Sequence, residues 1–438
     1  MTGLSRLSAL ALGLALTLAA CGDEEIILPG ERVDLRADPD VTEETGADRA
    51  RPLSLPAPTL NSSWTHVSAN PQHFAGHPAL GAALSPLWSV PIGEGNDRKH
   101  RITADPVSDG SRIYTLDSRA RVSAFSLSGE LIWARDLTPA SDRPDDASGG
   151  GLAVEGGTLY VSTAFGELHA VDAASGAERW VQDLDAAATG APTVAGGAVH
   201  VVTRNAVAWA VDTGTGRILW QTLGTVSDSG IAGGPAPAIA GDLVIYPYSS
   251  AQMIAVSRGS GEPVWSAIVG GERLGRAFSR VSDLTGDPVV VGQTVFAGNH
   301  AGRSAAFDLA TGEQLWSAEG GAMSPVTVMG GSVFLVSDEN RLMRLDAATG
   351  AEIWGNPLDL FPQRRFAKRR STYAHFGPVI AGGRLLVGSD DGLLRQYNPQ
   401  SGRLLATLRT GAPIARNPVV AGGTLFLVTG DGMLRAYR

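Results

Sequence analysis

Residues 324–354 read SPVTVMGGSVFLVSDENRLMRLDAATGAEIW, and this stretch decides the fold. It holds four short strand-like runs that are separated by a Gly-Gly pair, a polar turn and a Thr-Gly turn, and it ends on Trp354. Clear copies of the pattern end on Trp180, Trp220 and Trp316. A four-stranded unit that recurs about every 40 to 50 residues is typical of a β-propeller blade.

Counting the copies predicts the number of blades. Seven copies are complete, and they end near Trp133, Trp180, Trp220, Trp265, Trp316, Trp354 and Ala406, where alanine stands in place of tryptophan. Residues 417–438 then supply three strand-like runs, and the fourth run matches residues 84–90 near the other end of the chain. We therefore predict an all-β, eight-bladed β-propeller of four-stranded antiparallel blades, closed by pairing of N- and C-terminal strands, because closure leaves no open edge.

The recurring residues fit structural tasks better than catalytic ones. Each repeat tryptophan is expected to bury its ring between neighbouring blades; these residues are Trp88, Trp133, Trp180, Trp220, Trp265, Trp316 and Trp354. An aspartate comes just before a Gly-containing turn in four copies, at Asp172, Asp212, Asp308 and Asp346. A carboxylate in that position can accept hydrogen bonds from backbone amides, so we interpret these residues as turn caps.

The N-terminus predicts export and lipidation. Arg6, an apolar run from Leu7 to Leu18 and two alanines precede Cys21, so residues 1–20 are expected to be a signal peptide. The sequence Leu-Ala-Ala-Cys resembles a bacterial lipoprotein cleavage box, in which the cysteine becomes the lipidated first residue; an ordinary signal peptide is the alternative. Cys21 is the only cysteine, so the chain can form no internal disulfide.

Residues 21–60 are acidic and rich in Pro and Ala, so we expect a flexible tether ahead of a propeller that spans residues 61–438. The net charge of −9 argues against nucleic acid as a partner. Gly22 follows the cysteine, and by resemblance to enterobacterial sorting signals the absence of Asp there favours the outer membrane. The predicted location is therefore the outer membrane, lipid-anchored and facing the periplasm.

No residue pattern nominates an enzyme, a metal site or a cofactor. His73 and His77 have helical spacing, but Gly76 and Pro78 oppose a helix there, and no third ligand lies close by in the sequence. The repeat resembles that of quinoprotein dehydrogenases, which implies a vicinal disulfide beneath pyrroloquinoline quinone. A single cysteine cannot form that disulfide, so we predict a protein that is not an enzyme and binds no cofactor or metal.

Two loops depart from the minimal repeat, and long loops on a rigid scaffold often carry binding. A basic loop between the sixth and seventh copies contains Arg364, Arg365, Lys368, Arg369 and Arg370. It is either a solvated loop or a docking patch for an acidic protein or anionic head groups. The second loop, residues 270–287, contains Arg273, Arg276, Arg280 and Asp283.

The lipobox, the acidic tether, the eight copies and the terminal closure together resemble the BamB family of lipoproteins, which belong to the outer-membrane β-barrel assembly machine. Residues 279–290, 385–392 and 431–432 carry the densest similarity. The resemblance implies binding to the periplasmic POTRA domains of the barrel-inserting subunit. The family's contact pattern is matched by Arg280, Asp283 and the apolar Ile231. We expect Arg276 to bind the partner together with these residues. Thr285 and Ala232 depart from the pattern.

We therefore predict a non-catalytic scaffold that binds POTRA domains and nascent outer-membrane proteins. A dehydrogenase-like propeller dependent on pyrroloquinoline quinone is one alternative, and a free-standing envelope propeller that binds glycan or protein is another.

Overall fold

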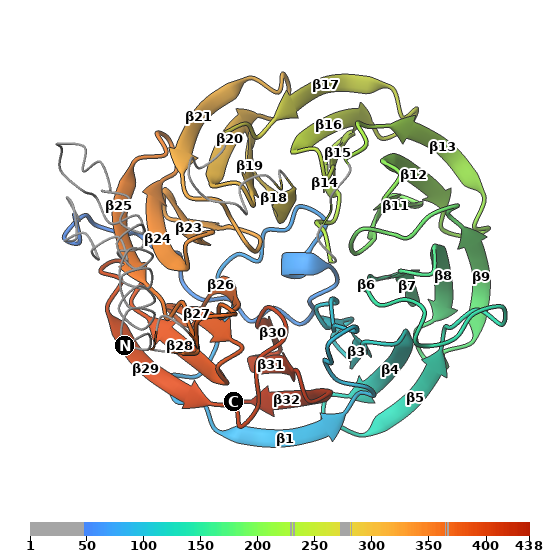
Figure 1. The fold of residues 1–438 in the computed structure, drawn as a ribbon, viewed down its shortest axis with the longest axis horizontal. Helices are drawn as coiled ribbons and strands as arrows, with labels where there is room; N and C mark the ends of the chain where they lie inside the picture. Colours follow the sequence, from blue (N-terminus) through green and yellow to red (C-terminus); the bar gives the residue numbers. More distant parts are fainter. Residues whose placement is uncertain are drawn as a thin grey trace, which may run out of the picture. The chain divides into compact units, whose positions relative to one another are not determined.

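The computed structural model describes residues 48–438 except 228–229, 231–232, 272–280, 282, 364 and 366–367. The described strands form eight four-stranded antiparallel sheets arranged around a central axis (Figure 1). The predicted all-β, eight-bladed propeller is therefore confirmed. The one helix among the described residues is a short 3-10 turn, η1 (Val67–Ala69). Within the described part of the chain, no helix is long and apolar enough to cross a membrane.

We letter the blades A to H in chain order, and each is given from its innermost to its outermost strand. Blade A comprises β2 (Val107–Ser108), β3 (Arg112–Leu116), β4 (Arg121–Ser126) and β5 (Leu131–Asp136), and blade B comprises β6 (Gly150–Glu155), β7 (Thr158–Thr163), β8 (Glu167–Asp172) and β9 (Glu178–Asp183). Blade C comprises β10 (Thr193–Ala195), β11 (Ala198–Val202), β12 (Val207–Asp212) and β13 (Ile218–Leu223), and blade D comprises β14 (Ala238–Ala240), β15 (Leu243–Pro247), β16 (Gln252–Ser257) and β17 (Pro263–Ile268). Blade E comprises β18 (Leu284–Val291), β19 (Thr294–Asn299), β20 (Arg303–Asp308) and β21 (Gln314–Glu319), and blade F comprises β22 (Thr327–Met329), β23 (Ser332–Val336), β24 (Arg341–Asp346) and β25 (Glu352–Pro357). Blade G comprises β26 (His375–Ala381), β27 (Arg384–Ser389), β28 (Leu393–Tyr397) and β29 (Leu404–Arg409).

Blade H joins the two ends of the ring. It consists of β30 (Val419–Ala421), β31 (Thr424–Thr429), β32 (Met433–Tyr437) and, as its outermost strand, β1 (Pro86–Pro91). Trp88 lies opposite Ala436 in the register, and Val90 lies opposite Leu434. The ring is thus closed by the predicted pairing of N- and C-terminal strands, and Figure 1 shows β1 alongside β32.

Burial follows strand position within each blade. In blade B, residues 159–163 of β7 are all buried, whereas the outer strand β9 alternates between exposed and half-buried residues. Successive blades face each other through apolar side chains, and one such cluster joins Tyr114 and Val122 of blade A to Leu152 and Val161 of blade B. The hydrophobic core is therefore a ring of interblade layers, and burial of this apolar surface stabilises each layer.

Each repeat tryptophan contacts the next blade at one defined place. Its indole Nε1 donates to a backbone carbonyl at the turn between the third and fourth strands of that blade, at Leu127, Ala173, Thr213, Arg258, Leu309, Ala347 and Gln400 in chain order. A glycine of the same turn lies against the ring. Gly176 has φ of +72°, and a Cβ there would lie only 2.6 Å from Trp133. Glycine is thus required both for the turn conformation and for the close approach.

The same geometry explains why Ala406 breaks the pattern. A tryptophan in that strand of blade G would contact the turn between the third and fourth strands of blade H. Those strands are β32 and β1, which are joined by no turn because they carry the two chain ends. The seam between blades G and H therefore offers no turn carbonyl and no turn glycine for an indole ring.

Residues 48–82, which we call the strap, cross the centre of the ring (blue in Figure 1). Backbone hydrogen bonds join the strap to seven blades, at Ser108, Val154, Ile239, Val290, Ile353, Gly382 and Gly422. His66 adds blade C through Val194. Residues 48–60 are part of the predicted tether, but they contact blades F and G. For example, Arg344 donates to the carbonyls of Arg51 and Pro52.

Candidate functional site

The loops that connect one blade to the next around blade D hold the predicted partner-binding residues. Ile231, Arg276 and Arg280 lie outside the described residues. Asp283 is described and is buried, with 3% of its surface exposed. Its backbone carbonyl accepts a hydrogen bond from the amide of His300 at 2.8 Å. Asp283 is therefore a fixed anchor at the base of its loop rather than a freely exposed charge.

The described parts of the two loops predicted to bind the partner come close together at one place. Gly230 belongs to the loop before blade D, and Asp283 belongs to the loop before blade E. A methyl group added to Gly230 would lie 3.8 Å from Asp283 Oδ2, 3.6 Å from Arg204 Nη1 and 3.5 Å from Ser249 Oγ. Residues from blades C and D thus line the place where the loops meet, and the exposed Arg204 adds a positive charge there.

An exposed apolar corner lies beside these loops. Leu223, at the end of β13, is 75% exposed, Val226 is 63% exposed, and Ile268, at the end of β17, is 61% exposed. The amide of Thr225 donates to Gln252 Oε1 at 3.1 Å, and Gln252 lies opposite Ile268 in the sheet register. Leu223, Val226 and Ile268 therefore share one edge of the molecule, which we call the C–D corner.

The C–D corner differs from the other exposed apolar positions of the outer strands. Those residues, such as Leu315 and Leu404, are only about half exposed. Exposed apolar side chains scattered singly are normal on a protein surface, whereas neighbouring ones beside long loops mark an interaction site. Leu223, Val226 and Ile268 were not singled out from the sequence, although a Leu and a Val close after Trp220 are the signal that could have indicated them.

The basic loop lies between β25 and β26, on the side of the ring opposite β13 (Figure 1). Arg364 lies outside the described residues, whereas Arg365, Lys368 and Arg370 are exposed. The guanidinium of Arg369 lies 4.6 Å from the centre of the Phe361 ring, a cation–π contact that orders part of the loop. The basic loop and the C–D corner are therefore separate surfaces.

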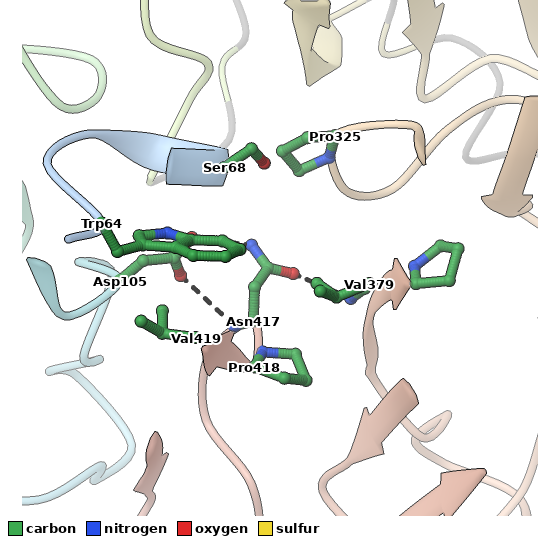
Figure 2. Close-up of a pocket in the computed structure, with 10 residues that line it drawn as sticks. Trp64, Ser68, Asp105, Pro325, Val379, Asn417, Pro418 and Val419 are labelled. Carbon is green, nitrogen blue, oxygen red and sulfur yellow. Dashed lines mark hydrogen bonds between the residues drawn. The ribbon is translucent and has the colours of Figure 1, made fainter. Parts of the chain in front are cut away.

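Polar residues at the inner ends of the blades lie beside the strap at the centre of the ring. Asp105 accepts hydrogen bonds from Arg416 Nε at 2.7 Å and from Asn417 Nδ2 at 2.8 Å. Figure 2 shows the Trp64 ring beside Asp105 and Asn417, with the dashed bond between these two residues. A cavity of about 60 Å³ adjoins this pair, and all eight blades contribute to its wall. We call it the axial cavity.

The described residues contain no group of three or more His, Cys, Asp or Glu placed to hold a metal ion. His73 and His77 are engaged elsewhere: His73 Nδ1 donates to the carbonyl of Pro288 at 2.8 Å, whereas His77 Nδ1 bonds to the carbonyl of Pro56 at 2.7 Å. Burial lowers the pKa of His73 to about 4, so the imidazole is neutral at neutral pH. These histidines therefore anchor the strap.

The sequence matches one family model along most of its length. The model is described as outer membrane protein assembly factor BamB, and it covers residues 118–356 and 363–438. The chain belongs to the BamB family. Two BamB proteins, from Moranella endobia and Yersinia pestis, are each 26% identical to it, over 73% of this chain and 81% and 80% of their own lengths.

Solved structures agree with this membership at the level of the fold. BamB from Moraxella catarrhalis superposes with a TM-score of 0.68 at 20% identity, over 81% of this chain and 100% of its own. A europium-containing methanol dehydrogenase reaches 0.67 at 14% identity, over 86% of this chain and 98% of its own. Identities this low show the shared fold alone, so it is BamB family membership that supports a role in outer-membrane protein assembly.

Proposed function

We propose that this protein is a lipid-anchored, non-catalytic scaffold of the outer-membrane β-barrel assembly machinery. It binds periplasmic POTRA domains of the barrel-inserting subunit through the C–D corner and the loops beside it. Cys21 carries the lipid, and the rigid ring presents the binding loops to the periplasm. Nascent outer-membrane proteins are further ligands of this scaffold.

This proposal rests on an exposed apolar surface, the C–D corner, that lies beside the two predicted loops. Leu223, Val226 and Ile268 offer apolar surface, and Arg204 and Asp283 lie where the two loops meet. An apolar centre with polar groups at its margin is the usual composition of a specific protein interface. Family resemblance implies partner contacts in these same loops, and the C–D corner adds an apolar surface beside them.

The axial cavity is too small for the cofactor that the dehydrogenase alternative requires. Its volume is about 60 Å³, whereas sites for cofactors and drug-sized ligands usually enclose about 300 to 1,000 Å³. The strap occupies the centre of the ring, with Trp64 and Val67 both buried there. A tricyclic quinone would have to displace these side chains. The single cysteine, Cys21, also excludes a vicinal disulfide.

Introducing negative charges into the apolar C–D corner should strongly weaken binding of the partner. We expect Leu223→Glu combined with Ile268→Glu to reduce capture of the barrel-inserting subunit from solubilised envelopes at least tenfold, because two carboxylates would have to be desolvated in the interface. The matched control is Leu404→Glu, at an exposed apolar position of blade G that is 49% exposed. The measurement is affinity capture of the lipidated full-length protein, followed by mass spectrometry.

The control variant should retain the partner at the wild-type level. Unchanged capture by the C–D double variant would rule out this corner as the docking surface. Absence of the barrel-inserting subunit from the wild-type capture would contradict the scaffold function itself, and a glycan or another envelope protein in its place would favour the free-standing propeller.

A further inference from the structure

The axial cavity lies where the segments that lead into the innermost strands of the eight blades come together. Residues at the inner ends of all eight blades line it, together with Val67 of the strap. Its wall is mixed, with apolar side chains such as Leu152, Met323 and Phe376 beside the polar groups Asp105, Asp287 and Arg416. A volume of about 60 Å³ holds a ligand of about five non-hydrogen atoms, because one water needs about 10 to 15 Å³ on this measure.

Asp287 is the acidic residue in this cavity that forms no direct ion pair among the described residues. It is 8% exposed, and its Oδ1 accepts a hydrogen bond from the backbone amide of Ala236 at 2.6 Å. No side chain in the described part of the chain donates to either oxygen of Asp287. A buried carboxylate that no side chain pairs with directly is costly to keep ionised, and a bound cation would lower that cost.

The other charges in the cavity already neutralise each other. The carboxylate of Asp105 accepts hydrogen bonds from Arg416 Nε and Asn417 Nδ2, and the backbone amide of Asn417 also donates to it at 3.2 Å. Arg416 and Asp105 thus form a pair with no net charge. Ionised Asp287 leaves the cavity with one unbalanced negative charge, so a ligand with a single positive charge is the electrostatic complement.

The residues of the cavity wall suit an organic cation better than a metal ion. A hard divalent cation requires about six to eight oxygen ligands, and the described residues hold no group of three candidate ligands. The guanidinium of Arg416 would also repel a divalent ion across the cavity. An alkylammonium group needs few acceptors, and its carbon chain would lie against Leu152, Met323 and Phe376.

We propose that the axial cavity binds an alkylammonium group through Asp287, carried either by a small free amine or by a lysine side chain. None of the C–D corner residues lines this cavity, although Gly233 and Gly234 of the loop before blade D do, and the proposal does not depend on the scaffold function. Burial raises the pKa of Asp287 to about 7, the nearby Asp105 carboxylate adds to this, and the Ala236 amide and Arg416 oppose it. Binding of a cation should therefore release a proton from Asp287 near neutral pH.

Calorimetric titration of the full-length protein with n-butylammonium chloride tests the site. We expect a dissociation constant of about 1 mM for so small a ligand, with tighter binding at pH 8 than at pH 6. 1-Butanol is the uncharged control of the same shape, and potassium chloride controls for ionic strength. Asp287→Asn retains the acceptor for Ala236 and removes the charge, so it should weaken binding at least tenfold.

A second arm distinguishes the two sources of the amine. Binding of both n-butylammonium and Nα-acetyl-lysine methylamide would assign the site to lysine side chains, whereas binding of n-butylammonium alone would assign it to a free amine. Equal affinity for 1-butanol and n-butylammonium, or no binding of either amine to the wild-type protein, would overturn the proposal. This comparison uses the wild-type protein and holds even where Asp287→Asn fails to fold.

Discussion

Trp354→Ala should lower the free energy of unfolding by about 3 to 5 kcal/mol, the usual cost of removing a large buried aromatic side chain. Trp354 is fully buried between blades F and G. Its ring packs near Phe334, with ring centres 6.2 Å apart, and its Nε1 donates to the carbonyl of Gln400 at 2.8 Å. Truncation would leave a cavity between two blades and a carbonyl without its donor.

Trp354→Phe is the matched control for this prediction. Phenylalanine keeps most of the apolar contact and loses the hydrogen bond to Gln400, so we expect a loss of about 1 kcal/mol from the bond and a further small loss from the reduced volume. Chemical denaturation at equilibrium measures both variants. A loss below about 1 kcal/mol for Trp354→Ala would contradict the interblade role assigned to the repeat tryptophans.

Acid should weaken the fold because several histidines are buried in the neutral form. Burial lowers the pKa of His66 and of His200 to about 3 and that of His73 and of His169 to about 4. Above pH 6.5 these histidines are neutral in both states, so their contribution to stability is fully present. Below pH 6.5 the unfolded chain binds protons that the folded protein does not, and stability falls.

Each such histidine should lower the free energy of unfolding by about 2 kcal/mol as the pH falls from 7 to 5. Asp287 acts in the opposite direction, because its raised pKa lets the folded protein bind a proton as the pH falls. His73→Asn isolates one histidine, since asparagine can donate to Pro288 in the manner of Nδ1 and tolerates the φ of +60° at this position.

We expect the loss of unfolding free energy between pH 7 and pH 5 to be about 2 kcal/mol smaller in His73→Asn than in the wild-type protein. Denaturation curves at both pH values measure this difference. The interval from pH 7.5 to pH 9 is the internal control, because His73 does not titrate there and the two proteins should respond alike. Identical losses between pH 7 and pH 5 would show that His73 is not buried in the neutral form.

The blades could be predicted from the sequence because each one is a local unit. Its four strands, its turn glycine and its tryptophan lie within about 50 residues, so they recur as a visible repeat. The eighth blade could be predicted as well, because residues 84–90 and 417–438 are complementary parts of one repeat. Ala406 is explained only by the structure, which shows that no turn follows β32 within blade H.

The strap, the C–D corner and the axial cavity could not be predicted because they depend on contacts between distant residues. The strap has no repeat of its own, and His66 and Val194 meet across 128 positions of the chain. Asp105, Asp287 and Arg416 stand in three separate copies and converge only when the ring closes. Family resemblance points to Asp283, but only the structure shows that it is buried and close to Gly230 of the loop before blade D.

Site-specific photo-crosslinking in intact envelopes tests the central claim most directly. A photoreactive phenylalanine analogue at Val226, which is 63% exposed at the C–D corner, should crosslink to the barrel-inserting subunit. The same analogue at Leu404 should give no such product. Crosslinking of that subunit from Leu404 or from Lys368 of the basic loop, with none from Val226, would contradict docking through the C–D corner.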